Sequence, residues 1–340
     1  MKKLLNTLYV TTPESYLSKD GLNIVISVRQ QEVFRIPIVN IEQIITFGYM
    51  GASPGLMKLC ADNGVSLTFL SPNGRFIGRF QGPVTGNVLL RTRQYRLTAD
   101  PDYSLSLARI FIAAKINNYR QILLRHLRDY GSEATVEEAE RKLNHCKGLA
   151  LKSTSSEELR GHEGDAASVY FSVFPRLLRT TDPVFRFNGR NRRPPRDAVN
   201  CMLSFVYTLI TNDCTAALDS VGLDPYVGLF HTLRPGRPSL ALDIMEEMRA
   251  YLGDRLVLSL INRRQINGRD FISQGEDSVT ATDEGRKTIL QAWQQRKKEI
   301  IMHPFLKEKI PIGLLPYVQS QLLARTIRDS IDIYPPFLIK

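Results

Sequence analysis

Three segments of the chain carry side chains that could together hold a divalent metal ion. Glu163 lies in the motif Gly161-His162-Glu163-Gly164, His231 follows much later, and residues 243–247 read Asp-Ile-Met-Glu-Glu. Carboxylates, with an imidazole among them, are donors that Mg²⁺ and Mn²⁺ accept in proteins. A cation held in this way polarises a phosphodiester and activates the nucleophile that attacks it. The three segments therefore indicate metal-assisted chemistry on a phosphate ester, provided that the fold brings them together.

The acidic run also has a simpler explanation. We expect a helix to begin at Ser239, whose side chain can cap the first turn. Asp243, Glu246 and Glu247 then share one face of this helix. Such a face is often merely solvated, but His231 precedes it across a tight loop and can fold back over the acids. A solvated helix face therefore stands as the alternative to a metal site.

Glu163 and His231 likewise have ordinary alternatives. Glu163 could be a first-turn glutamate that favours the dipole of a helix over residues 165–174. His231 could be a histidine without a chemical role at the end of an apolar helix. We expect that ordinary role for the remaining histidines, although one of them adjoins Glu163 and could orient it: His126, His145, His162 and His303.

The chain is basic, with 45 lysine and arginine residues against 34 acidic ones and a net charge of +11. Arginines cluster in two segments, over residues 91–96 and 186–196. The planar guanidinium can pair with two phosphate oxygens at once, whereas a lysine ammonium acts as a point charge. A mildly basic surface can also serve solubility alone. The clustering favours a nucleic-acid partner, and we expect that partner to be DNA.

Length and composition limit the class of protein. With 340 residues and 43% hydrophobic content, the chain is long enough for two domains with substantial cores. Polar residues interrupt the apolar start of the sequence and no apolar run reaches membrane length, so we expect a soluble, cytoplasmic protein. No CxxC pair occurs among the cysteines, which argues against a zinc ribbon or a disulfide framework: Cys60, Cys146, Cys201 and Cys214.

Short β-branched and aromatic runs dominate the first part of the chain and predict strands. Between two of these runs, Pro72-Asn73-Gly74 predicts a hairpin turn, and residues 53–63 have the apolar spacing of a helix. The runs cover residues 7–12, 22–28, 33–37, 65–70 and 76–80.

The pattern changes near residue 95, and from residue 104 apolar side chains recur at helical spacing. We therefore expect an α+β protein with a small β-rich domain over residues 1–95. A larger, all-helical catalytic domain should follow over 96–330, and a C-terminal tail over 331–340. After the helical segments that begin at 104, further helices are predicted over 137–147, 157–160, 197–218 and 286–298.

Several motifs together resemble the CRISPR-associated integrase and endonuclease that inserts spacers into a CRISPR array. The most specific stretch runs from Gly222-Leu223-Asp224-Pro225 through His231 to Glu246. The resemblance covers about residues 1–265, and the ending Tyr334-Pro335-Pro336-Phe337-Leu338 resembles members found beside type I-C systems. Other matching segments are Ile36-Pro37-Ile38, Ala114-Lys115-Ile116-Asn117, Glu163-Gly164 and Arg193-Pro194-Pro195.

This resemblance implies a metal-dependent DNA endonuclease and integrase that serves CRISPR adaptation, an antiviral defence. Its metal ligands fall on Glu163, His231 and Glu246, with Asp243 as the adjacent acidic position. The last ligand is often aspartate in the family, so the choice between Asp243 and Glu246 as the direct ligand stays open. With Mg²⁺ or Mn²⁺ bound, such a site activates a DNA 3′-hydroxyl for attack on a phosphodiester.

The resemblance also implies partners. They are double-stranded DNA, as spacer precursor and CRISPR repeat, a second copy of the chain bound through the β-domains, and a small ferredoxin-like companion protein. With that companion the family forms a hetero-hexamer. Several basic residues of the helical domain are our candidates for holding DNA phosphates: Lys115, Arg190, Arg192, Arg193, Arg234 and Arg237.

Two other functions remain open at the level of the sequence. The same metal site could belong to a structure-selective nuclease that cuts branched DNA intermediates without integration. The chain could also be a basic nucleic-acid-binding scaffold without catalytic activity, in which the acidic helix is merely solvated.

Overall fold

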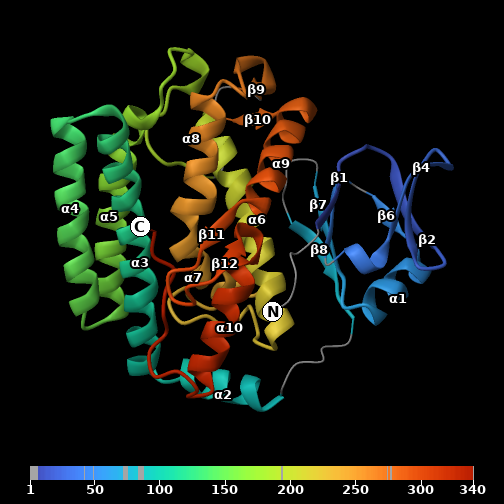
Figure 1. The fold of residues 1–340 in the computed structure, drawn as a ribbon, viewed down its shortest axis with the longest axis horizontal. Coiled ribbons are helices and arrows are strands. Elements are labelled where there is room, and N and C mark those ends of the chain that lie inside the picture. Colours follow the sequence, from blue (N-terminus) through green and yellow to red (C-terminus); the bar gives the residue numbers. More distant parts are fainter. Residues whose placement is uncertain are drawn as a thin grey trace. The chain divides into compact units, whose positions relative to one another are not determined.

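The computed structural model describes residues 7–41, 43–48, 50–71, 76–82, 88–192, 194–273, 275 and 278–339. The chain forms two compact units, residues 1–85 and residues 86–340, both drawn in Figure 1. The first unit is rich in strands and the second is mostly helical. This composition confirms the predicted α+β class.

Two four-stranded sheets form most of the N-terminal unit. In the first sheet, β5 lies between β1 and β7 and is parallel to both, and β8 pairs antiparallel with β7. In the second, the order is β4-β3-β2-β6, and β3 is antiparallel to both of its neighbours. The strands are β1 (Thr7–Val10), β2 (Ser15–Asp20), β3 (Asn23–Val28), β4 (Gln31–Pro37), β5 (Gln43–Phe47), β6 (Gly51–Ala52), β7 (Ser66–Leu70) and β8 (Phe76–Phe80).

Helix α1 (Pro54–Asp62) contacts a strand of each sheet, β2 and β7. The Ser53 hydroxyl caps it by accepting a hydrogen bond from the Leu56 amide at 3.1 Å, as the residue type predicts. The apolar face of α1 is buried with side chains from both sheets, among them Leu17 and Ile44. These contacts give the unit a hydrophobic core of its own.

The predicted strands of this unit are confirmed as β1, β3, β4, β7 and β8. Three strands were missed, β2, β5 and the two-residue β6. The chain of β2 mixes serine, lysine and aspartate with only two large apolar residues, so its sequence carries little strand signal. The predicted turn at residues 72–74 lies outside the described residues.

The second unit consists of long helices with two small antiparallel ladders, β9–β10 and β11–β12, so the expectation of an all-helical domain is wrong in this detail. Its helices are α2 (Val88–Thr98), α3 (Pro101–Tyr130), α4 (Ala134–Lys152), α5 (Ser156–Leu177), α6 (Ala198–Val221), α7 (Ser239–Met248), α8 (Arg255–Asn262), α9 (Asp283–Lys298) and α10 (Leu315–Ile327). A π-helical turn, η3 (Arg249–Asp254), connects α7 to α8. The short strands are β9 (Phe271–Ser273), β10 (Val279–Ala281), β11 (Ile300–Met302) and β12 (Lys309–Pro311).

Helices α3, α4 and α5 pack side by side as a group at one edge of this unit (Figure 1). Helix α6 lies in its interior and contacts α7 and α10. By length and composition α6 could cross a membrane, but 72% of its apolar window is buried inside the unit. Its hydrophobicity is therefore that of a core helix.

The predicted helices over 157–160 and 165–174 form one helix, α5, and the predicted start of α7 at Ser239 is confirmed without its predicted cap. Helix α5 begins at Ser156, where the Ser155 hydroxyl caps it, so Glu163 lies in the helix interior and not in a first turn. Two glycines flank Glu163 without ending the helix, because α5 packs along α3 and α4. At α7, Ser239 does not cap the first turn, since its hydroxyl donates to the Thr232 carbonyl at 3.2 Å.

The C-terminal segment 331–339 packs on α3 and α7. Tyr334 and Phe337 are buried, and the Tyr334 hydroxyl donates to Glu247 Oε1 at 2.6 Å. The Phe337 amide donates to the other oxygen of Glu247 at 2.7 Å. Asn118 of α3 donates to the carbonyls of both Glu247 and Phe337. The segment is thus tied to the helix that carries the acidic run.

Candidate metal centre

The fold brings Glu163, His231 and Glu246 together around a lysine. Glu163 comes from α5, His231 from the loop before α7, and Glu246 from α7 itself. Lys115 of α3 donates to Glu163 Oε1, and its Nζ lies 2.8 Å from Glu246 Oε2. His231 Nε2 is 3.9 Å from Glu246 Oε1. Segments that are distant in the sequence therefore meet at one position.

Lys115 is buried, with only 2% of its side chain exposed. Burial alone would lower the pKa of this lysine, but the carboxylates of Glu246 and Glu163 raise it overall, so the ammonium stays charged. Its positive charge is used to neutralise two acids. The expectation that Lys115 holds DNA phosphates is therefore wrong, because the ammonium faces the carboxylates and not the surface.

Glu246 is buried as well, and Arg249 supplies a second positive charge. The Arg249 guanidinium donates to Glu246 Oε1 at 2.6 Å and lies over the ring of Tyr207, with 4.8 Å from guanidinium carbon to ring centroid. Burial would raise the pKa of Glu246, but Arg249, Lys115 and His231 lower it well below its usual range. Glu246 is therefore an anion at neutral pH.

Asp243 holds the loop that carries His231. Its Oδ2 accepts the amides of Leu229 and Phe230 at 2.6 and 3.0 Å. Its Oδ1 accepts the amide of His231 at 2.9 Å and lies 2.6 Å from Nδ1 of the same histidine. With Nδ1 engaged by a carboxylate, the imidazole is oriented so that Nε2 is its remaining donor atom.

A close approach of the loop to α7 makes this arrangement possible. A Cβ at Gly228 would lie 2.6 Å from Ser239 Cβ and 2.8 Å from Asp243 Oδ2, so a side chain does not fit there. The loop amides reach the carboxylate of Asp243 for the same reason.

Glu247 does not belong to this cluster. It is fully buried and accepts hydrogen bonds from Tyr334, Gln319 and the Phe337 amide. Burial raises the pKa of Glu247 to about 7. The alternative of a single solvated acidic face is therefore wrong for this helix. Asp243, Glu246 and Glu247 are all buried and contact different partners.

As placed in the structure, the described residues include no group of three His, Cys, Asp or Glu side chains close enough to hold one metal ion. The Lys115 ammonium lies between the carboxylates of Glu163 and Glu246. The cluster nevertheless opens to the surface, because Glu163 is 25% and His231 17% exposed. The two deeper groups, Lys115 and Glu246, form its floor.

The sequence matches a known protein family. Residues 8–295 match the family model described as CRISPR associated protein Cas1. The chain belongs to the Cas1 family. It is 52% identical to CRISPR-associated endonuclease Cas1 1 of Chlorobaculum tepidum over 99% of each chain. It is 48% identical to CRISPR-associated endonuclease Cas1 2 of Rhodospirillum rubrum over the full length of both.

Solved structures of lower identity share the fold of this Cas1-family chain. A Cas1 protein from Thermotoga maritima has a TM-score of 0.82 at 22% identity and covers 98% of this chain and 100% of its own. A casposase bound to its integration product has a TM-score of 0.81 at 23% identity, covering 98% of this chain and 92% of its own. At these identities the likeness shows the fold alone.

The arginines expected to bind DNA differ in their surroundings. Arg190 is held inside the Cas1 fold, where its guanidinium donates to Asn200 Oδ1 at 2.7 Å and Ser204 Oγ at 3.1 Å. Burial lowers its pKa. Arg192 and Arg234 are exposed and Arg237 is partly exposed, whereas Arg193 lies outside the described residues. The geometry thus gives Arg190 a structural role, whereas Arg192 and Arg234 lie at the surface.

A cavity of about 720 Å³ lies beside the part of α5 that runs from Ala167 to Pro175, after Glu163. The aromatic rings of Phe171 and Phe187 line it, together with Arg190 and Arg192. Phe171 and Phe187 are buried in its wall, so the exposed Arg192 is the group of this cavity that could pair with a phosphate.

Sequence reasoning missed three residues of the buried network that begins at Glu246: Arg249, Tyr207 and Asp254. The Tyr207 hydroxyl donates to Asp254 Oδ1 at 2.5 Å, and Arg249 lies between this pair and Glu246. The spacing of three between Glu246 and Arg249 is the one signal that could have found the arginine. Tyr207 sits in the largely buried helix α6 and gave no such signal.

Proposed function

We propose that this Cas1-family chain is a metal-dependent DNA endonuclease and integrase of CRISPR adaptation, which joins a DNA 3′-hydroxyl to a phosphodiester of the repeat array. The observation that carries the proposal is the convergence of Glu163, His231 and Glu246 on one cationic position. Curated relatives at 48% identity and above are named endonucleases. A casposase of the same fold was solved with an integration product.

The donor set fits Mg²⁺ or Mn²⁺. Two carboxylates and one imidazole are suitable ligands, and the imidazole favours manganese modestly. The position between Glu163 and Glu246 already stabilises a positive charge, that of the Lys115 ammonium. Lys115 and a divalent cation would compete for the same carboxylates. When bound, the cation would polarise the target phosphate and favour ionisation of the attacking hydroxyl.

The protein's own residues prepare this site. Asp243 accepts a hydrogen bond from the Nδ1–H of His231 and so presents Nε2 as the ligand atom, which makes Asp243 a positioning residue and Glu246 the third ligand. Arg249 holds one oxygen of Glu246 in place. At the surface, Arg192, Arg234 and Arg237 pair with DNA phosphates and bring the strand to the cluster.

We further propose that the protein is a soluble, cytoplasmic homodimer and acts with a small ferredoxin-like companion protein in a hetero-hexamer. A Cas6-RT-Cas1–Cas2 complex contains a chain with the same fold, at a TM-score of 0.83 and 21% identity, and this chain covers 36% of that one. The N-terminal unit exposes apolar side chains on β2 to β4 and the following turn that a second copy could cover: Tyr16, Leu22, Val33, Phe34 and Val39. A type I-C affiliation stays a prediction.

The test is strand transfer of a labelled 3′-hydroxyl duplex into a supercoiled plasmid that carries the repeat, with Mn²⁺ present. We expect Glu163→Gln and His231→Ala to abolish joining and cleavage while DNA binding is retained. His162→Ala is the matched control, because His162 adjoins Glu163 but faces Glu158, at 3.6 Å. Survival of both activities in Glu163→Gln would refute the metal site. Cleavage without joining by the wild type would favour the structure-selective nuclease.

A further inference from the structure

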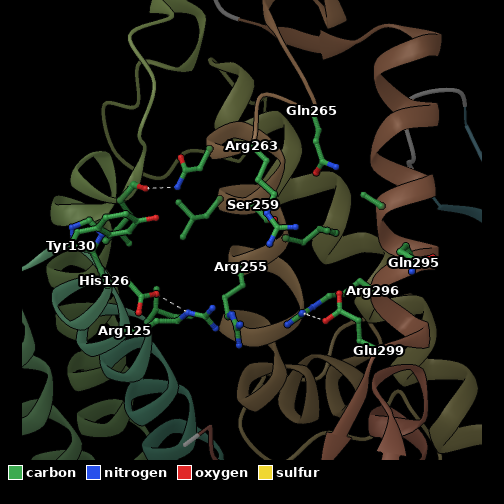
Figure 2. Close-up of a pocket in the computed structure, with 17 residues that line it drawn as sticks. Arg125, His126, Tyr130, Arg255, Ser259, Arg263, Gln265, Gln295, Arg296 and Glu299 are labelled. Carbon is green, nitrogen blue, oxygen red and sulfur yellow. Dashed lines mark hydrogen bonds and ion pairs between the residues drawn. The ribbon is translucent and has the colours of Figure 1, made fainter.

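A second pocket in the helical unit lies apart from the metal cluster. It has a volume of about 560 Å³ and is lined mainly by residues of α3, α8 and α9, and no lining residue belongs to the cluster (Figure 2). Arg255 projects into it between Arg125 and Arg296, and Arg263 directly follows the last residue of α8. Four arginines thus share one pocket with two carboxylates, those of Asp129 and Glu299.

The two carboxylates are engaged by two of the arginines. Arg296 pairs with Glu299, and Arg125 donates to Asp129 at 3.3 Å. Arg255 makes no ion pair with a carboxylate of the described residues. It remains a guanidinium without an acidic partner at the centre of the pocket.

A shared aromatic ring holds Arg255 close to Arg296. The guanidinium carbons of Arg255 and Arg296 lie 4.6 and 4.7 Å from the centroid of the Tyr251 ring. Burial lowers the pKa of Arg255 to about 10, and the charges of Arg296 and Arg125 add to this effect. A partly buried cation beside like charges is unfavourable unless an anion accompanies it.

The residues that could accept such an anion follow one face of α8. Arg255, Ser259 and Arg263 are spaced by four, so they lie one above the other and all line the pocket. The guanidinium fork and a hydroxyl are the donors that bind phosphate oxygens. Eight residues of helix span about 12 Å, which is enough for several phosphates of one strand.

We propose that this pocket binds a phosphate group, with Arg255 as the central hydrogen-bond donor and Ser259 and Arg263 as additional donors. The most direct source is the backbone of a DNA strand, and that source rests on the proposed function. Phosphate binding itself does not depend on the proposed function. The net charge of +11 favours a polyanion of this kind over an acidic peptide.

The first measurement is calorimetric titration of the full chain with inorganic phosphate at constant ionic strength. We expect Arg255→Gln to weaken phosphate binding by about tenfold or more, the usual effect of losing a charged hydrogen-bond donor. Arg325→Gln is the matched control, since Arg325 is exposed on α10 and does not line the pocket. Arg263→Gln, at the exposed end of the stripe, repeats the test if Arg255→Gln does not fold.

The second measurement is the affinity for a single-stranded oligonucleotide as a function of salt. Reduced affinity and a flatter salt dependence in Arg255→Gln identify DNA as the source of the phosphate. Loss of inorganic phosphate binding with unchanged DNA affinity supports the pocket with a free phosphate compound as its ligand. Unchanged binding of both in Arg255→Gln and Arg263→Gln overturns the proposal, as does binding of polyglutamate without binding of phosphate.

The two proposals fail separately. Glu163→Gln should lose strand joining and keep inorganic phosphate binding, because Glu163 does not line this pocket. If wild-type protein joins strands but binds no phosphate at Arg255, the pocket is refuted and the metal centre stands.

Discussion

At the scale of single residues, Lys115 explains how two acids are tolerated in a buried cluster. Its ammonium contacts both Glu163 and Glu246, and Arg249 binds Glu246 from the other side. Burying one carboxylate without a partner is costly, and two would also repel each other. The cluster is therefore balanced by positive charges supplied from within the chain.

We predict that Lys115→Met lowers the free energy of unfolding by about 3–5 kcal/mol in buffer with a chelator, because Glu246 loses a buried partner. Added Mn²⁺ should then raise the melting temperature more in the variant than in the wild type, since no ammonium competes for the carboxylates. Thermal unfolding with and without Mn²⁺ measures both effects. Lys142→Met is the control, as Lys142 forms an exposed pair with Glu138 on α4. Equal melting temperatures for wild type and Lys115→Met would contradict this account.

The sequence could identify the residues that meet at the cluster but not their separate roles. Glu163, His231 and Glu246 carry chemistry that is visible from residue type. The difference between Asp243 and Glu246 depends on where the loop amides of residues 229–231 point, and no spacing rule fixes that path. Lys115 looked like a phosphate ligand because charge is visible in a sequence whereas burial is not.

At the scale of elements, the C-terminal segment fixes the position of α7. Tyr334→Phe removes the hydroxyl that donates to Glu247 at 2.6 Å and leaves a buried acceptor with one bond fewer. We predict a loss of about 1–3 kcal/mol in unfolding free energy. Urea unfolding of the variant beside Tyr130→Phe, whose hydroxyl is on an exposed residue, provides the comparison. An effect no larger than that of Tyr130→Phe would show that the segment is only loosely attached.

The π-helical turn η3 places Asp254 in a buried position, where burial raises its pKa from 3.8 to about 6. The folded protein then binds a proton that the unfolded chain releases between about pH 4 and pH 6. Folding stability contributed by this group is present below pH 4 and is lost as pH rises to 6, by about 3 kcal/mol at most. Asp254→Asn should remove this decline. Measuring the unfolding free energy of wild type and Asp254→Asn across pH 4–7 tests this prediction. Parallel curves of unfolding free energy against pH for the two proteins would disprove it.

The long helices were predictable from apolar spacing, but their ends depended on local contacts. Residues 197–218 carry a clear helical pattern and form most of α6. The predicted helices over 157–160 and 165–174 form one helix, α5, because packing against α4 overrides the break that Gly161 and Gly164 suggested. A π-helical turn over 249–254 has no signature in the residue pattern, so the burial of Asp254 was not predictable.

At the scale of the whole molecule, the net charge of +11 should make DNA binding strongly dependent on salt. We predict that Arg192→Gln weakens DNA binding and lowers the slope of log affinity against log salt by about one, without a change in sequence preference. Arg190→Gln should instead reduce thermal stability, because Arg190 is bound to Asn200 and Ser204. Fluorescence anisotropy over a range of salt concentrations separates the two variants. A shifted sequence preference with an unchanged slope would argue against phosphate contact by Arg192.

The α+β class was visible in the sequence because strand and helix patterns occupy different parts of the chain. The pairing of β1 with β5 and of β5 with β7 was not, since parallel partners far apart in the chain leave no local mark. The small ladders β9–β10 and β11–β12 were missed for another reason. Strands of three residues are too short to show alternation.

The lysine at the centre of the cluster also bears on the order of events after synthesis. Since its charge already balances the two glutamates, the helical unit can complete its folding in a cell that is short of manganese or magnesium. Ion uptake then becomes a late step, taken by a finished protein. Under the proposed function, a newly made protein would not cut the host chromosome until it has bound the metal ion.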